Sequence, residues 1–465
     1  MSFPAPPVAD PEVAQRDSTH ADGGSGGSTI ADSTTPSQQL ITERVGTALQ
    51  MDPVITEIEG PARELQTPSL NRLWWGVTAS TVASRTLVIT YPLLALATTH
   101  SPTAVGLTTA MLTVPGLLFY LPVGVLADRV APHFLIRQGE SFRAAIIITV
   151  MIMVALGVAQ LPLILVAAFL EGTLSTVYSV AEAALVPLVA HDDKVDAALA
   201  ASERSTQLGA LVARPLAGAL FGLNQVLPFI IGPILVLLSS RSVPRYEEKC
   251  AVAPEYRAWP TGRFRLKELR AAIVEGFQEL RSHSFLRAAV ILTAATNFMV
   301  NALIVAFIAS SIEVGPLIVG LVLAAGSIGG TLGTILAERT QSQKWILSIH
   351  LVIWTFALML PAVNQHPVFF AFALLLTGWG AATNVAMRRY EKDKVAADKL
   401  ARVVSVSRLA GHAAVVAAAL VGGLLVDTWN IQVATRILSI TMVTICVPFG
   451  VWLLFLSKNR VRTPA

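Results

Sequence analysis

The sequence predicts an all-α membrane protein with twelve transmembrane helices in two pseudo-symmetric six-helix bundles. Three observations lead to this fold class. Apolar runs of about 20 residues, the length that spans a bilayer, follow one another through most of the 465 residues, of which 54% are hydrophobic and 14% charged. Lys and Arg gather in alternate gaps between these runs, and two short motifs recur at equivalent places in the two halves. Soluble chains carry about 25% charged residues, so a cytosolic protein is excluded.

Each apolar run is expected to form a helix, because every unpaired backbone group in hydrocarbon costs several kcal/mol. The spans lie, in chain order, at 73–98, 104–126, 141–160, 162–188, 202–222, 225–240, 285–310, 315–337, 345–362, 366–387, 403–426 and 431–456. The long gap 241–284 is basic, and we expect part of it to form an amphipathic helix on anionic lipid headgroups. A nucleic-acid partner would need aromatic platforms or a folded domain in this gap, and we expect none.

Residues 1–70 are rich in Pro, Ser, Thr, Gly and Asp and are expected to form a disordered tail, because they cannot bury enough apolar surface to offset the entropy of ordering. The chain then divides into the cytoplasmic tail at 1–70, an N-terminal six-helix bundle at 71–240, a basic linker at 241–284, a C-terminal six-helix bundle at 285–457 and a short tail at 458–465. Cys250 and Cys446 supply neither a disulfide framework nor a metal-ligand spacing, and no phosphate loop, zinc motif or nucleophile elbow occurs. We expect no enzyme activity, no metal and no cofactor.

The distribution of Lys and Arg predicts the orientation in the membrane. Gaps without any Lys or Arg lie at 99–103, 157–161, 223–225, 311–316, 363–367 and 427–431. The other gaps are basic, and Arg129, Arg137 and Arg143 are assigned to one of them. Because basic loops stay in the cytoplasm, both termini are expected there, in a multi-pass protein of the cell (plasma or inner) membrane.

Two short motifs repeat between the halves. Asp193-Lys194-Val195 precedes the fifth span, and Asp393-Lys394-Val395 precedes the eleventh. Leu126-Ala127-Asp128-Arg129 ends the second span, and Leu336-Ala337-Glu338-Arg339 ends the eighth. These matches indicate a duplicated six-helix unit, which many transporters use to build a central site between two bundles.

At these motifs the chain resembles the Major Facilitator Superfamily, whose loop between spans two and three reads Gly-x-Leu-Ala-Asp-Arg-x-Gly-Arg-Arg. Gly124, Leu126, Ala127, Asp128 and Arg129 match its first half, while Ala131, Pro132 and His133 replace the basic half. The stretches 101–107, 276–283 and 400–405 resemble the branch that contains the enterobactin exporter and related drug:proton antiporters. The resemblance covers about residues 70–460, and it implies alternating access and an efflux function.

The resemblance also implies a gate at the cytoplasmic side. A helix N-terminus carries partial positive charge, so Asp128, next to Arg129, can dock against the start of the eleventh span near Arg402. Glu338, next to Arg339, can do the same at the fifth span. Alternatively, these residues only end helices and obey the charge rule.

Three charged residues fall near the middle of apolar runs. Arg85, Glu171 and Arg214 each lie near mid-bilayer depth, counting about 1.5 Å per residue. A lone charge there costs about 2.5–3.5 kcal/mol, so we expect Glu171 to pair with Arg85 or Arg214. The other arginine is left for an anionic group on a substrate, although a purely structural ion pair is the alternative.

Further polar residues extend this set of candidates for a substrate and proton pathway. Desolvation favours the protonated form of a carboxylate, so Glu171 or Glu182 is the proton carrier that we expect. Asn297 and Asn301 lie one turn apart on the seventh span, and Asn384 lies in the tenth. Such amides bind substrate or hold helices together.

We therefore predict a secondary active transporter that moves a small organic molecule, a siderophore or an amphipathic drug, out of the cell in exchange for protons. Its expected partners are this substrate, protons and the lipid bilayer, and the protein is expected to be a monomer. Three alternatives remain: an importer or lysophospholipid flippase of the same fold, a facilitator without proton coupling, and a non-transporting membrane sensor or scaffold that recruits partners through its tail.

Overall fold

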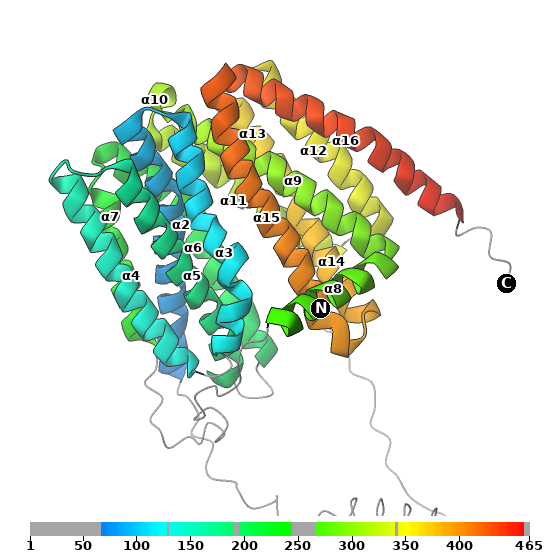
Figure 1. The fold of residues 1–465 in the computed structure, drawn as a ribbon, viewed down its shortest axis with the longest axis horizontal. Helices are drawn as coiled ribbons and strands as arrows, with labels where there is room; N and C mark the ends of the chain where they lie inside the picture. Colours follow the sequence, from blue (N-terminus) through cyan, green and yellow to red (C-terminus); the bar gives the residue numbers. More distant parts are fainter. Residues whose placement is uncertain (1–66, 128–129, 190–194, 244–265, 340–342, 460–465) are drawn as a thin grey trace, which may run out of the picture. The chain divides into compact units, whose positions relative to one another are not determined.

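The computed structural model describes residues 67–127, 130–189, 195–243, 266–339 and 343–459. Every regular element in these ranges is a helix (Figure 1). The first half contains α2 (Thr67–Thr99), α3 (Pro102–Ala127), α4 (Pro132–Ala155), α5 (Leu161–Val189), α6 (Val195–Leu223) and α7 (Leu227–Ser242). The second half contains α9 (Ser284–Ala309), α11 (Pro316–Arg339), α12 (Gln343–Val363), α13 (Pro367–Thr377), α14 (Gly380–Lys394), α15 (Ala397–Trp429) and α16 (Ile431–Asn459). Two further helices are α8 (Leu266–Ser282), between the halves, and the short α10 (Ser311–Val314).

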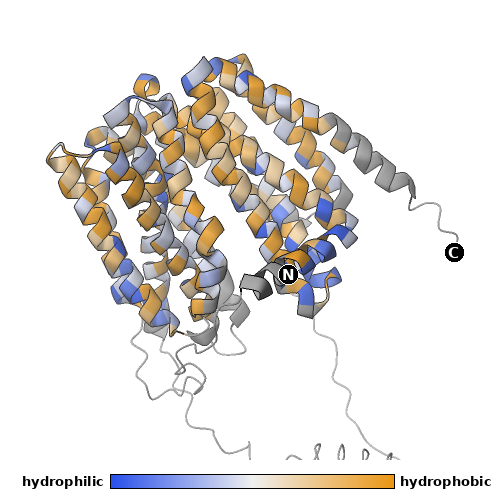
Figure 2. Ribbon diagram, viewed as in Figure 1, coloured by the Kyte–Doolittle hydropathy of each residue, from blue (hydrophilic) through white to orange (hydrophobic). Residues whose placement is uncertain are grey.

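The predicted number of spans is confirmed. Within the described ranges, nine helices are long and apolar enough to cross a membrane, and three shorter apolar helices lie at Leu208–Leu223, Leu227–Ser242 and Ile431–Cys446. Each of these twelve helices overlaps one predicted span. Figure 2 shows the apolar residues along the helix bodies and hydrophilic residues at the lower helix ends and on α8.

The third span differs from the prediction. Its helix, α4, begins at Pro132 instead of residue 141, with a proline in the first turn, where the missing N–H costs nothing. Arg143 therefore does not lie in a cytoplasmic loop. It lies eleven positions after Pro132, about 17 Å along the helix axis, and its side chain is completely buried. The apolar pattern missed this first part of α4 because charged residues interrupt it.

The tenth span continues from α13 into α14 through a tighter turn, because Gly378 and Trp379 keep right-handed helical backbone angles. Between α13 and α14, the amides of Gly378 and Trp379 bond to carbonyls three residues back, at 3.3 and 3.1 Å, instead of four. Gly378 lies against the backbone of Gly329 in α11, so closely that a side chain at Gly378 would collide with it. The close packing of the tenth span on α11 therefore depends on glycine.

The two halves meet at two pairs of helices, α3 with α15 and α6 with α11 (Figure 1). Gly106 packs against Gly423, and Gly218 packs against Gly320, with backbone in contact with backbone. These contacts lie toward the non-basic end, by which we mean the end with the gaps that lack Lys and Arg. Small residues permit this close approach, which supplies van der Waals packing in a lipid environment.

The linker between the halves contains the amphipathic helix that we expected, α8. It packs against the start of α15. Lys399 donates to the Glu279 carboxylate at 2.9 Å, and Arg402 forms an ion pair with Glu275. Residues 1–66, 244–265 and 460–465, which include most of both predicted tails, lie outside the described residues.

Candidate functional site

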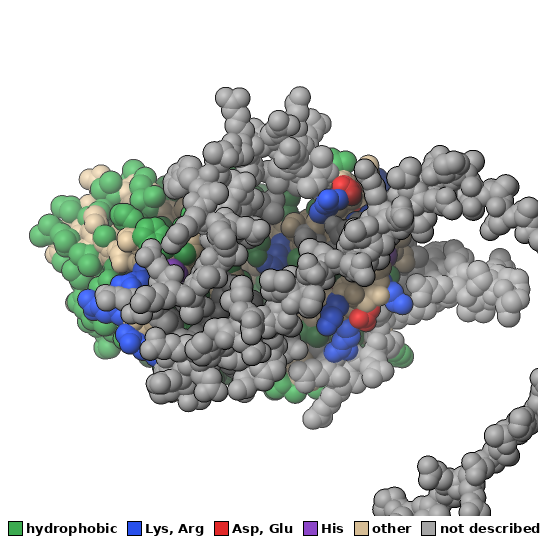
Figure 3. All heavy atoms as spheres, turned by 90° about the horizontal axis from the view of Figure 1, so that it is seen from below, with side chains coloured by type: hydrophobic (Ala, Val, Ile, Leu, Met, Phe, Trp, Pro, Cys, Tyr) green, Lys and Arg blue, Asp and Glu red, His purple; other side chains and the backbone are tan. Residues whose placement is uncertain are grey.

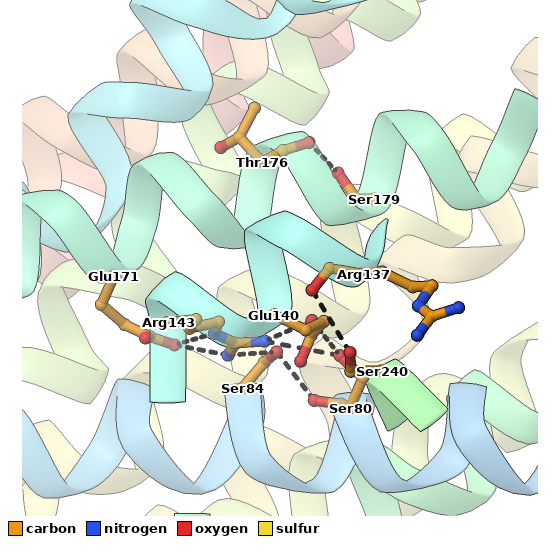
Figure 4. Close-up of polar contacts among 9 residues, drawn as sticks. All are labelled: Ser80, Ser84, Arg137, Glu140, Arg143, Glu171, Thr176, Ser179 and Ser240. Carbon is orange, nitrogen blue, oxygen red and sulfur yellow. Dashed lines mark hydrogen bonds and ion pairs between the residues drawn. The ribbon is translucent and has the colours of Figure 1, made fainter. Parts of the chain in front are cut away.

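A buried ion cluster joins α2, α4 and α5. Arg143 donates from Nε to Glu171 Oε1 at 2.7 Å and from Nη1 to Glu140 Oε1 at 3.2 Å, and its Nη2 bonds both Glu171 and, at 2.7 Å, Ser84. Ser80 donates to Glu140 at 3.0 Å. We call these five residues the Arg143 cluster. Figure 4 shows them converging, while the side chain of Arg137 points away.

The Arg143 cluster corrects the expected pairing of Glu171. Its partner is Arg143, and not Arg85 or Arg214. Glu140 and Arg143 are fully buried and Glu171 is 2% exposed, so each charge depends on the others for compensation. Sequence reasoning missed Glu140 and Arg143 because it started the third span too late. The signal that could have found them is their spacing of three residues, which places both side chains on one face of a helix.

The first of three cavities lies beside this cluster, within the N-terminal half. It measures about 340 Å³ and is lined by α2, α3, α5 and α6 and by His412 of α15. Arg85, Glu171 and Glu182 all line it, so the structure brings three of the predicted pathway residues together. Ser202 of α6 donates to Glu182 at 2.6 Å. We call this space the Glu171 cavity.

The second cavity, of about 440 Å³, is lined by α9, α14 and α15 and is called the Arg408 cavity. Its lining includes the predicted residues Asn297 and Asn384. Arg408 donates to the hydroxyl of Tyr120 in α3, and its guanidinium lies 5.3 Å from the centre of that ring. This contact joins the two halves. Arg388, Lys392 and Arg408 make its lining mostly basic, with Glu391 as the one acidic side chain among the described residues of that lining.

The third cavity, of about 270 Å³, lies where α6 meets the C-terminal half, and we call it the His350 cavity. Arg214, Asn301, His350 and Trp354 line it, together with Asn297 and Asn384. Arg214 donates from Nη1 to the carbonyl of Leu323 in α11 at 2.5 Å. This arginine therefore reaches across from one half to the other.

The three cavities are adjacent because they share lining residues. His412 lines both the Glu171 and Arg408 cavities, and its ring would lie 3.4 Å from a side chain at Gly116 of α3. Asn297 and Asn384 line both the Arg408 and His350 cavities. All seven predicted pathway residues thus line one series of cavities, and their roles in transport remain predictions. Viewed from the basic end, Lys and Arg side chains gather on two sides of this face (Figure 3).

The predicted gating residues are only partly visible. Asp128 and Arg129 lie outside the described residues, and Glu338 and Arg339 are described only as the last turn of α11. Arg402 is described, and its ion-pair partner is Glu275 of α8. The gate therefore remains a prediction. In the described ranges, no three His, Cys, Asp or Glu side chains are grouped so that they could hold a metal.

A family comparison decides what kind of protein carries these cavities. The model of the Major Facilitator Superfamily matches residues 73–337 and 286–465. The chain belongs to the Major Facilitator Superfamily. No curated protein sequence matches it significantly.

Solved structures share this superfamily fold. The nucleoside transporter NupG is similar with a TM-score of 0.64 at 13% identity, covering 82% of this chain and 98% of NupG. A bacterial homolog of the human lysosomal transporter Spinster, in an inward-facing and unoccupied conformation, is similar with a TM-score of 0.59 at 15% identity, covering 86% of this chain and 98% of the homolog. As a member of the superfamily, the chain is a multi-pass membrane transporter of small molecules and not an enzyme.

Proposed function

We propose that this transporter exports a small organic molecule, a siderophore or an amphipathic drug, in exchange for protons, as in the enterobactin-exporter and drug-antiporter branch. The observation that carries the proposal is the position of Glu171. Its carboxylate is buried in the Arg143 cluster and also lines a cavity. Of the three charged members of the cluster, Glu171 is the one that lines this cavity and that a proton or a substrate can reach through it.

The charges of the Arg143 cluster support proton binding. Glu140 and Glu171 supply two carboxylates, against one guanidinium. The Oε2 atoms of both carboxylates are buried and accept no hydrogen bond from any described residue. One bound proton makes the cluster neutral and supplies a donor, which a desolvated site favours.

Exchange then follows from competition. A hydroxyl, amide or ammonium group of the substrate binds the ionised Glu171 carboxylate, and a proton at Glu171 removes that negative charge. The ionised transporter therefore binds the substrate, and the protonated transporter does not. Rocking of the two halves about their contacts exposes Glu171 to the two sides in turn.

The direction of opening supports the same cycle. Close glycine contacts hold the halves together toward the non-basic end, whereas the Arg408 cavity extends to Lys392 and Leu400 near the basic end. We place the basic end and both termini in the cytoplasm of a cell-membrane protein, by the positive-inside rule. In this orientation the cavities face the cytoplasm, from which an exporter loads. Asp128 and Glu338 close that side in the opposite state, and a monomer suffices.

The test uses purified protein in liposomes with an imposed pH gradient, and ethidium and a catecholate siderophore as probes. Wild-type protein is expected to move a probe against the direction of proton flow, and Glu171→Gln is expected to abolish this coupled flux. Glu313→Gln, an exposed carboxylate in α10, is the matched control and is expected to transport normally. Flux that ignores the gradient, flux with the protons, or an active Glu171→Gln variant would each contradict proton-coupled export.

A further inference from the structure

Two stacked rings of α12 line the His350 cavity with unused hydrogen-bonding atoms. His350 and Trp354 lie one turn apart, with ring centres 5.3 Å apart and planes at 14°. His350 is fully buried and Trp354 is 3% exposed. Neither His350 Nε2 nor Trp354 Nε1 has a hydrogen-bond partner among the described residues. An unsatisfied buried polar atom costs about 1–3 kcal/mol, so two in one cavity wall indicate a missing partner.

Both atoms are donors. His350 Nδ1 lies 2.6 Å from the hydroxyl of Thr383 in α14, and this is the one hydrogen bond of that hydroxyl in the described part of the chain. Since a buried hydroxyl donates its hydrogen where an acceptor is available, Nδ1 accepts it and Nε2 carries the proton of the neutral ring. The indole N–H of Trp354 can only donate.

A glycine brings the backbone of the tenth span close to these donors. Gly380 begins α14, and a side chain there would lie 3.3 Å from Trp354 Cζ2 and 3.8 Å from His350 Cε1. The backbone approaches both rings because glycine stands at this position.

The remaining polar lining has the same character. Arg214 brings a guanidinium from α6, and Asn297 and Asn384 bring amides from α9 and α14. No Asp or Glu side chain lines this cavity among the described residues. Donors without a competing carboxylate suit a ligand group that offers acceptor oxygens and negative charge.

We propose that the His350 cavity is a subsite for a carboxylate of the transported molecule, held by Trp354 Nε1, His350 Nε2 and Arg214. This inference rests on the proposed function and deepens it. The donor group of the substrate binds at Glu171, and its carboxylate binds in the C-terminal half. One molecule that contacts both places connects the two halves.

The subsite is tested by binding to the full-length protein in detergent at constant pH, with benzoate, salicylate and their methyl esters as probes. We expect both carboxylates to raise the thermal unfolding temperature and the esters to do so much less. Trp354→Phe keeps an aromatic ring but removes the indole N–H, and should weaken carboxylate binding about tenfold, since it removes a hydrogen bond to a charged group. Trp345→Phe, on the same helix at a 67% exposed position, should bind as the wild type does.

A second variant keeps the inference falsifiable if Trp354→Phe folds poorly. Asn384→Asp places a carboxylate in the cavity. This variant should bind benzylamine better than benzoate, whereas the wild type should prefer benzoate. No carboxylate binding by the wild type, equal affinity for acids and esters, or unchanged preference in both variants would overturn the subsite. The binding measurements use no pH gradient, so they give the same result whether or not transport is coupled to protons. If the gradient drives flux but no carboxylate binds, the subsite is rejected and the proposed function is not.

Discussion

Arg143 is the residue on which the buried charges of the N-terminal half depend. It bonds Glu140, Glu171, Ser80 and Ser84 from three helices. Breaking a buried ion pair by removing one partner costs about 3–5 kcal/mol, because a charge is left without compensation. The cluster is therefore a structural joint between α2, α4 and α5 as well as the proposed proton site.

We expect Arg143→Met to destabilise the protein by about 3–5 kcal/mol, measured by thermal or denaturant unfolding in detergent. Arg137→Met is the matched control on the same helix, since that side chain lies outside the cluster, and it should change stability little. Adding Glu140→Gln to Arg143→Met removes one of the two uncompensated carboxylates and should recover part of the loss. Equal stability of Arg143→Met and the wild type would contradict the role of the cluster.

At the level of elements, α8 is held to the start of α15 by charged contacts on a close-packed surface. A side chain at Gly276 would lie 2.7 Å from the carbonyl of Arg402, so the two helices approach closely. The hydrogen bond from Lys399, aided by the charge of Lys399 and by His283, lowers the pKa of the Glu279 carboxyl below its usual value of 4.5, although desolvation opposes the shift. Protonation of Glu279 therefore weakens this contact.

The docking of α8 should consequently depend on pH. Because the pKa of Glu279 is lower in the docked state, its contribution is complete above about pH 4.5 and is lost as the pH falls through the lower, docked value. Hydrogen exchange of residues 266–282, corrected for intrinsic rates, should show weaker protection in acid. Glu279→Gln should show weaker protection already at pH 7 and no further change in this range, and a pH response that persists in this variant would assign the effect to another group.

At the scale of the whole transporter, the two halves are in closest contact through glycine at the non-basic end. Thr103 of α3 donates to Asp427 of α15 at 2.8 Å beside the contact between Gly106 and Gly423. A side chain at Gly423 would lie 2.8 Å from the carbonyl of Pro102. The halves can therefore close at the non-basic end only because Gly423 has no side chain.

We expect Gly423→Leu to oppose this closure by about 1–3 kcal/mol and to shift the population about 5- to 150-fold toward the state that is open at the non-basic end. Maleimide labelling of Thr103→Cys, with Cys250 and Cys446 replaced, should become faster in this variant, while transport falls. Gly450→Leu is the control, since a side chain at Gly450 meets open space. Unchanged labelling would show that this contact does not close the transporter.

Much of the fold follows from local composition. Hydrocarbon requires about 20 apolar residues for each helix, whatever its neighbours are, so the spans could be counted along the chain. The motif at Gly124–Arg129 and its counterpart at Leu336–Arg339 indicated the duplication and the superfamily. The start of α4 could not be predicted in this way, because buried ion pairing allows charged residues in its first turns, and that pairing involves residues from other helices.

The sequence by itself determined that this is a twelve-span transporter with a few polar residues near the middle of their spans, because span length and the place of a residue within its span depend only on position along the chain. Tertiary structure alone decided that Glu171 pairs with Arg143, that Arg214 reaches Leu323 across the two halves, and that His350 and Trp354 lie close to Gly380 of α14. Those contacts depend on the rotation and packing of helices far apart in the sequence. A difference of a few ångströms in packing decides which charge a buried carboxylate meets.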